Sequence, residues 1–284
     1  MRWALLALIA APAALADNHV QDPGSPWPTN VDLPRATAMG GAGASVATGN
    51  EAFSINPAGL AQSRRYHLEV DGVYDSKFPT QGILASIVDS ATAPVASGLL
   101  FSRWASGQPA GRGEGWSLGF GYAGPTGQGL FMGGETKFLR FHTPEGLVQK
   151  WAQDVGLLAR RGTFSWAAVV QNIALDKIPL FPLTGTASMS WGTDADWHLA
   201  FDYKADFSDT SHVKSKLALG GELLAGESVV LRAGATRDIS ANQWWLSAGV
   251  GLLSEKGGLQ VVWRRRVTGP YDQFFEGGLT IYLE

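Results

Sequence analysis

The sequence predicts an all-β protein, a fourteen-stranded antiparallel transmembrane β-barrel with an N-terminal hatch inside its lumen. Three observations predict this fold. Segment after segment alternates apolar and polar residues with a period of two, as a strand with one apolar and one polar face does. The segments are about 10 residues long, the length that a tilted strand needs to cross a bilayer. The connections are alternately short and long, as in outer-membrane barrels, whose periplasmic turns are tight.

The composition excludes several classes of protein. The chain has 284 residues, a net charge of −3 and no cysteine, so it forms no disulfide and no thiolate metal site. A charge this small gives no reason to expect nucleic acid as a partner. The five histidines include no His-x-x-x-His pair, and we expect neither a metal nor another cofactor. The 36 glycines and 11 tryptophans, with only 17% charged residues, are consistent with a membrane barrel.

The N-terminus predicts export. Arg2 is followed by a short apolar core, and Ala14-Leu15-Ala16 is a small-x-small cleavage site. The apolar core is shorter than the ~20 residues of a membrane-spanning helix, which argues against the alternative of an anchor. We therefore expect a cleaved signal peptide at residues 1–16 and a location in the outer membrane of a Gram-negative bacterium. Residues 17–34 contain four prolines and predict an irregular lead-in.

Residues 35–65 predict the hatch. This segment is too rich in glycine and alanine for a strand and too interrupted by glycine for a regular helix. Glycine and alanine allow a backbone to approach a barrel wall closely, and Asn56-Pro57 is a turn-initiating pair. Arg35 is placed to pair with a lumen carboxylate, for which Glu69, Asp71 and Glu222 are candidates. The alternative is a flexible periplasmic linker, but the segment also carries several apolar residues that water would not favour: Met39, Val46, Phe53, Ile55 and Leu60.

Residues 66–284 predict the barrel itself. In the first segment Leu68 and Val70 share the apolar face, and His67, Glu69 and Asp71 share the polar face. The predicted strands lie near 66–75, 81–90, 94–104, 114–124, 128–141, 151–161, 163–173, 183–193, 196–207, 213–225, 228–238, 242–254, 258–268 and 272–284. The longer outer loops are expected at 76–80, 105–113, 142–150 and 174–182.

The strands of a soluble β-sandwich also alternate apolar and polar residues, so the prediction of a membrane barrel depends on other features. The strands are longer than the about 5–6 residues typical of globular strands. A closed barrel leaves no unpaired edge in lipid. Aromatic residues near strand ends predict interfacial girdles: Tyr66, Tyr74, Trp104, Trp116, Trp151, Trp244 and Phe274. Glycines within strands predict curvature and close packing of a plug: Gly119, Gly121, Gly133, Gly134, Gly220, Gly221, Gly249 and Gly251.

The polar face supplies a candidate lumen network rather than an active site. Its residues are His67, Glu69, Asp71, Asp202, Lys204, Glu222 and Arg264. Both signs of charge are present, so no strong ion selectivity follows. Gly115 to Gly119 matches Gly-x-Ser-x-Gly, but a nucleophile elbow requires a helix after the serine, and here a strand continues. We expect no catalytic residues and no enzymatic activity.

The start of the mature chain resembles a known superfamily. Pro34-Arg35-Ala36-x-x-Met39-Gly40-Gly41-Ala42 is followed by Glu51-Ala52-Phe53-x-x-Asn56-Pro57-Ala58-Gly59-Leu60 and then by a first strand at Tyr66. This beginning resembles the FadL-type long-chain fatty acid transporters and their PorV-like branch. The resemblance implies that an Arg-Ala helix-turn and an Asn-Pro-Ala turn form a hatch inside a fourteen-stranded barrel. The hatch motif residues would be Arg35, Gly40, Gly41, Asn56 and Pro57.

The resemblance leaves alternative functions open. A FadL-type barrel would take up hydrophobic compounds such as long-chain fatty acids, which escape past the hatch or through the wall. A PorV-like barrel would instead be a non-transporting scaffold that docks proteins of a secretion, surface-attachment or motility complex. A general porin is a third reading, which a hatch would obstruct. Membrane lipid, a hydrophobic small molecule and other envelope proteins are thus the candidate partners.

One outer loop is markedly apolar. Its candidate residues are Ile178, Leu180, Phe181 and Leu183. They would form either a hydrophobic lip for a ligand or an anchor in the outer leaflet.

Overall fold

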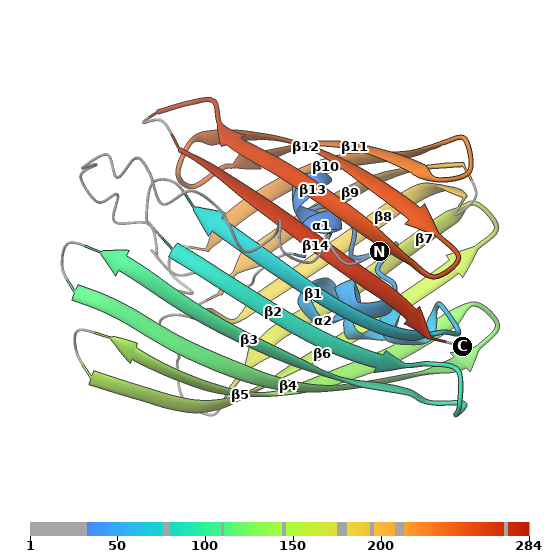
Figure 1. Ribbon diagram of the computed structural model, residues 1–284, viewed down its shortest axis with the longest axis horizontal. Coiled ribbons are helices and arrows are strands. Elements are labelled where there is room, and N and C mark those ends of the chain that lie inside the picture. The colour runs from blue at the N-terminus through green and yellow to red at the C-terminus, as the bar shows by residue number, and fades with distance from the viewer. Residues whose placement is uncertain are drawn as a thin grey trace, which may run out of the picture.

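The computed structural model describes residues 33–75, 80–108, 111–143, 146–174, 181–193, 196–207, 213–269 and 272–283. The predicted signal peptide and most of the lead-in lie outside these residues. Fourteen antiparallel strands form one closed barrel, in which each strand pairs with its neighbours in sequence and β1 pairs with β14 (Figure 1). The predicted fold class is confirmed.

The strands occupy the predicted segments. Their bounds are β1 (Tyr66–Asp75), β2 (Thr80–Asp89), β3 (Ala96–Gln108), β4 (Gly111–Gly127), β5 (Leu130–Thr143), β6 (Gly146–Arg161), β7 (Phe164–Ile173), β8 (Thr184–Thr193), β9 (Trp197–Asp206), β10 (Lys214–Ala225), β11 (Val229–Asp238), β12 (Gln243–Ser254), β13 (Gly257–Arg266) and β14 (Gln273–Leu283).

The prediction of long outer loops at 105–113 and 142–150 is wrong, because most of these residues belong to strands. The pairing of β3 with β4 continues to Gln108 opposite Gly111, and the pairing of β5 with β6 continues to Thr143 opposite Gly146. The glycine-rich and polar composition of these stretches resembles that of loops. It nevertheless forms strand, because the antiparallel ladder is built from backbone hydrogen bonds that any non-proline residue can make.

The two faces of the wall differ as they do in membrane barrels. Leu99, Phe120 and Val250, all on the outer face, are about half exposed. Inward-facing positions such as Glu69 and Asp202 are polar and buried. An apolar exterior around a largely polar interior is the distribution found in outer-membrane barrels. None of the helices among the described residues combines the length and the apolar character that spanning a bilayer requires.

The barrel has two distinct ends. We call the end with Tyr66 and Leu283 the near rim, and the end where Asp75 pairs with Phe274 the far rim. The near rim carries short turns, such as residues 162–163 between β6 and β7 and 255–256 between β12 and β13. Tight turns mark the periplasmic side of outer-membrane barrels, so the far rim corresponds to the outer side.

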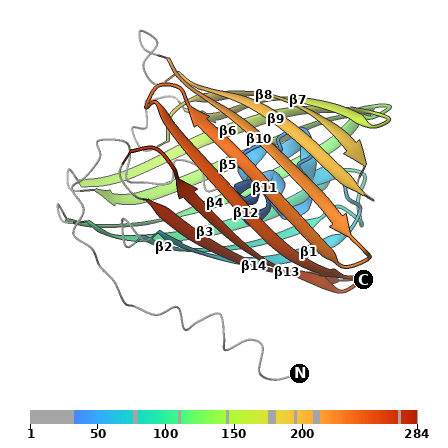
Figure 2. The ribbon, with the colours of Figure 1, turned by 90° about the horizontal axis from the view of Figure 1, so that it is seen from above.

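A compact helical segment lies within the ring of strands (Figure 2). It consists of α1 (Pro34–Ala38), η1 (Gly49–Glu51), α2 (Ala52–Ile55) and η2 (Pro57–Ala61). Pro34 and Pro57 occupy first-turn positions, where the missing N–H has no intrahelical partner to lose. The segment is therefore a folded plug and not a flexible linker.

Candidate functional site

The hatch contacts the wall at three places where two glycines face each other across neighbouring strands. These cross-strand pairs are Gly98 with Gly121 on β3 and β4, Gly133 with Gly156 on β5 and β6, and Gly220 with Gly234 on β10 and β11. We call these three places the glycine seats. The ring of Phe53 packs on the first, Pro57 packs on the second, and the backbone of Met39 packs on the third. Because glycine has no Cβ, the wall at these places admits a backbone or ring at contact distance.

The first hatch motif forms the turn over the third seat. Gly40 and Gly41 have φ values of 73° and 81°, and Gly41 N donates to Ala36 O over 2.7 Å, which ends α1. Thr236 Oγ1 on β11 donates to the carbonyl of Gly40. A Cβ on Gly40 would lie 2.7 Å from Ala235 N, so glycine is required here by both backbone conformation and space.

The second motif ties the hatch to the wall through one amide side chain. Asn56 is completely buried. Its Nδ2 donates to Ala44 O at 2.8 Å and to Leu157 O on β6 at 3.4 Å, and its Oδ1 accepts from Ala58 N at 3.1 Å. Asn56 therefore caps η2, holds a second hatch segment and contacts β6 at once, with Pro57 lying on Gly133.

Arg35 makes the ion-pair connection between the hatch and β10. Its Nε and Nη2 donate to the two carboxylate oxygens of Glu222 at 2.8 and 3.0 Å, and its Nη1 donates to Glu51 at 2.9 Å. Glu222 is thus the partner among the three candidates named from the sequence. Arg232 Nε also donates to Glu222, at 2.6 Å. A bidentate guanidinium–carboxylate pair fixes orientation as well as adding energy.

Burial and charge oppose each other in this cluster. Burial alone would lower the pKa of Arg35, but the carboxylates of Glu222 and Glu51 hold it above its ordinary value. Burial raises the pKa of Glu51, and the nearby Arg35 offsets only part of that shift. Arg35 therefore stays charged, and it is the group that makes a buried carboxylate at Glu51 tolerable.

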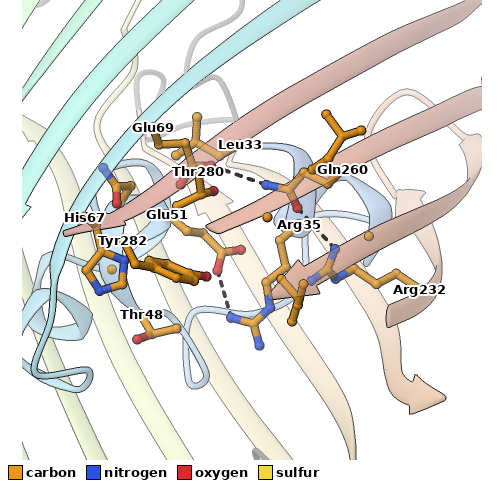
Figure 3. Close-up of a pocket in the computed structure, with 16 residues that line it drawn as sticks. Leu33, Arg35, Thr48, Glu51, His67, Glu69, Arg232, Gln260, Thr280 and Tyr282 are labelled. Atoms are coloured by element: carbon orange, nitrogen blue, oxygen red, sulfur yellow. Dashed lines mark hydrogen bonds and ion pairs between the residues drawn. The ribbon is translucent and has the colours of Figure 1, made fainter. Parts of the chain in front are cut away.

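A cavity of about 110 Å³ lies beside this cluster, between the hatch and the wall formed by β1 and β11–β14 (Figure 3). Arg35, Thr48 and Glu51 border it from the hatch. Its wall-side polar residues are His67, Glu69, Arg232, Gln260, Thr280 and Tyr282. Leu33, Leu253 and Leu259 also line it. A cavity of this size with several polar partners suits water.

The residues of the predicted lumen network do face the lumen, but they do not form one cluster. His67 packs edge-on against Tyr282 with ring centroids 5.2 Å apart. Glu69 joins the Arg35 cluster through Gln260, whose Nε2 lies 3.3 Å from its carboxylate. Asp71 is buried close to Pro34 and Gly278.

The remaining members of that set lie on other parts of the wall. Asp202 accepts from Ala44 N at 3.0 Å and so holds the hatch from β9. Lys204 Nζ lies 3.4 Å from Gln171 Oε1. Arg264 lies nearer the far rim, with its guanidinium 5.2 Å from the Trp245 ring centroid.

A second polar cluster was missed from the sequence. Lys137 Nζ on β5 lies 2.8 Å from the Asp154 carboxylate on β6 and 2.7 Å from Asn172 Oδ1 on β7. Gln171 Nε2 donates to the hatch carbonyl of Ser54 at 2.9 Å. Asn172 has φ 61° beside a register shift between β6 and β7, which turns two consecutive side chains inward. The alternation of their strands predicts that Lys137 and Asp154 face the lumen, so this pair could have been found from the sequence. No residue pattern in the sequence predicts the bulge that turns Asn172 inward.

Above the hatch, toward the far rim, part of the lumen wall is apolar. The buried side chains of this lumen apolar patch are Leu33, Leu84, Trp104, Leu139, Phe141 and Ala152. Trp104 lies over Gly82 on the paired strand, and Phe141 lies over Gly115 in the same way. Each aromatic ring therefore occupies the space that a side chain on the glycine opposite would fill. The prediction that Trp104 belongs to an interfacial girdle is wrong, because it is 3% exposed and faces inward.

The predicted apolar loop is only partly described. Phe181 packs on Phe141 with ring centroids 5.1 Å apart and so borders the lumen apolar patch. Leu183 is 39% exposed. Ile178 and Leu180 lie outside the described residues. Phe274, also assigned to a girdle, faces inward, 5.7 Å from the Arg264 guanidinium.

Known proteins share this architecture. Neither a family model nor a curated protein matches the sequence. Among solved structures, the CymD monoaromatic hydrocarbon channel matches with a TM-score of 0.72 at 14% identity, over 89% of this chain and 97% of that one. The Ralstonia pickettii toluene transporter TbuX matches with a TM-score of 0.71 at 13% identity, over 89% and 98%.

The Pseudomonas putida toluene transporter TodX matches with a TM-score of 0.65 at 13% identity, over 88% of this chain and 96% of that one. These matches are to transport channels rather than to enzymes. At this identity the likeness concerns the fold. It confirms the predicted likeness to FadL-type barrels: this chain has their fourteen-stranded architecture, with a helical segment inside.

Proposed function

We propose that this protein is an outer-membrane channel for small hydrophobic compounds, and that monoaromatic hydrocarbons are the compounds it carries. The observation that supports this is the lumen apolar patch. The interior of a porin for polar solutes is polar, because it holds water. Here Trp104 and Phe141, which face the lumen on β3 and β5, are apolar and large.

The orientation of the rings supports a path for flat apolar solutes. Because Gly82 and Gly115 bear no side chain, each ring lies against the wall instead of across the lumen. A planar hydrocarbon that displaces Phe181 from Phe141 would stack on such rings by offset or edge-to-face contact. The fold likeness to channels named for toluene and monoaromatic hydrocarbons supports the same class of solute. Long-chain fatty acids and the PorV-like scaffold role stay sequence-based predictions.

The proposal predicts a specific effect at Phe141. In intact cells that make the Phe141→Asp variant, the initial rate of toluene uptake is expected to fall at least about tenfold. Stripping water from a carboxylate in an apolar path costs more than the about 1–3 kcal/mol of a neutral polar group. The matched Phe141→Leu variant keeps the patch apolar and should transport within about twofold of the wild type. The proposal would be contradicted if the Phe141→Asp variant, folded and present in the membrane in the same amount as the wild type, took up toluene at the wild-type rate.

A further inference from the structure

Cationic side chains on the outer face of the barrel gather at one rim. Arg103, Arg140, Arg237 and Arg265 occupy outward positions near the far rim, as their alternation with exposed apolar residues shows. Among the described strand residues, Arg161 alone is an outward-facing cation at the near rim. An arginine on the lipid face is tolerated at the interface and strongly disfavoured at the bilayer centre, so the far rim lies at a headgroup layer.

Two of these arginines belong to an ordered surface across β3 to β6, strands that lie side by side in Figure 1. Arg103 pairs with Trp116, which in turn pairs with Arg140. The two arginine backbones are therefore two strand spacings apart, about 10 Å. Trp116 lies between them as an interfacial aromatic.

The next row toward the near rim is entirely apolar. It runs from Phe101 through Leu118 and Phe138 to Trp151. Phe138 packs against Trp116 and Trp151 with ring centroids 5.5 and 4.9 Å apart. On this surface the cationic row is therefore followed, toward the near rim, by a continuous apolar row that suits contact with acyl chains.

We propose that this surface, Arg103, Trp116 and Arg140 above Phe101, Leu118, Phe138 and Trp151, binds an outer-leaflet glycolipid whose broad headgroup carries two phosphates. Guanidinium groups bind phosphate oxygens in a bidentate fashion. The backbones of Arg103 and Arg140 are about 10 Å apart, so each guanidinium can take a separate phosphate of one broad headgroup, whereas a glycerophospholipid offers only one. Glu114 lies one row farther out on the same face, opposite His142.

The test is native mass spectrometry of the full-length protein in detergent, titrated with diphosphoryl lipid A. Each arginine near an anionic lipid surface contributes about a fivefold factor in binding. The Arg103→Gln/Arg140→Gln double variant is therefore expected to bind about 25-fold more weakly, and each single variant about fivefold more weakly. Arg161→Gln, the matched change at the near rim, should bind as the wild type does.

Two comparisons of ligands complete the test. Monophosphoryl lipid A and phosphatidylglycerol are expected to bind more weakly than diphosphoryl lipid A, and millimolar inorganic phosphate should not compete. The proposal is overturned if the double variant or both single variants retain wild-type binding, or if Arg161→Gln weakens binding equally. Equal binding of phosphatidylglycerol, or competition by free phosphate, would overturn the assignment to a diphosphorylated glycolipid.

Discussion

Replacing Gly234 with alanine is expected to displace the hatch from the wall without opening the barrel. A Cβ at Gly234 would lie 2.1 Å from the carbonyl carbon of Met39 and 2.2 Å from Gly40 N. These are backbone atoms, which cannot rotate away as a side chain does. The ladder between β10 and β11 does not depend on this side chain, so the strands should still close. The hatch should therefore become sensitive to protease while the barrel remains folded.

Gly72→Ala is the matched control, because a Cβ there would meet nothing within 4 Å. The measurement is limited proteolysis of the purified barrel, followed by mass spectrometry of fragments from residues 34–61. We expect Gly234→Ala to be cut at least about tenfold faster than Gly72→Ala, which corresponds to at least about 1.4 kcal/mol of overpacking. If both variants resist cleavage equally, the glycine seats do not hold the hatch.

Removing the charge of Arg35 should loosen the hatch by about 3 kcal/mol. Breaking a buried ion pair from one side typically costs about 3–5 kcal/mol, because a carboxylate is left without its partner. In Arg35→Met the aliphatic stem is kept, Glu222 retains Arg232, and Glu51 loses its cation. The expected result is a hatch that opens about 100-fold more often, measured by hydrogen exchange of the α1 and η1 amides.

Arg64→Met serves as the control for losing a positive charge near the hatch. Arg64 is exposed and donates to Ala91 O, so its removal should change hatch exchange by less than about 0.5 kcal/mol. In the Arg35→Met/Glu51→Gln double variant the unpaired charge is gone, and we expect part of the protection to return. Unchanged hatch exchange in Arg35→Met would show that the glycine seats and Asn56 suffice without the ion pair.

The strands were predictable because each carries its own local signal. In β9, for example, Trp197, Leu199 and Phe201 alternate with His198 and two further inward residues, so one window of sequence fixes both strand and face. The hatch was predictable because it lacks this alternation. Glycine and alanine dominate it, and the Asn56-Pro57 pair marks its turn.

What the sequence could not supply depends on register between strands. Glu69, Asp71 and Glu222 were equivalent candidates for Arg35. The structure packs α1 against β11–β14, and from there the Arg35 side chain reaches Glu222 on β10. Trp104 was assigned to an interfacial girdle because it lies near a strand end. The structure shows that it faces the lumen, where its ring lies over Gly82 on the paired strand. The extended pairing at Gln108 and Thr143 likewise comes from backbone hydrogen bonds that composition does not reveal.

The proposed function requires that an apolar solute enter the lumen above the hatch and rest on the lumen apolar patch. Crystals of the purified protein soaked with bromobenzene, and measured at the bromine absorption edge, test it directly. We predict an anomalous peak inside the barrel, in contact with Trp104 and Phe141 and on the far-rim side of Leu33. Bromine peaks confined to the outer, lipid-facing surface, with the lumen apolar patch vacant at saturating bromobenzene, would contradict the claim.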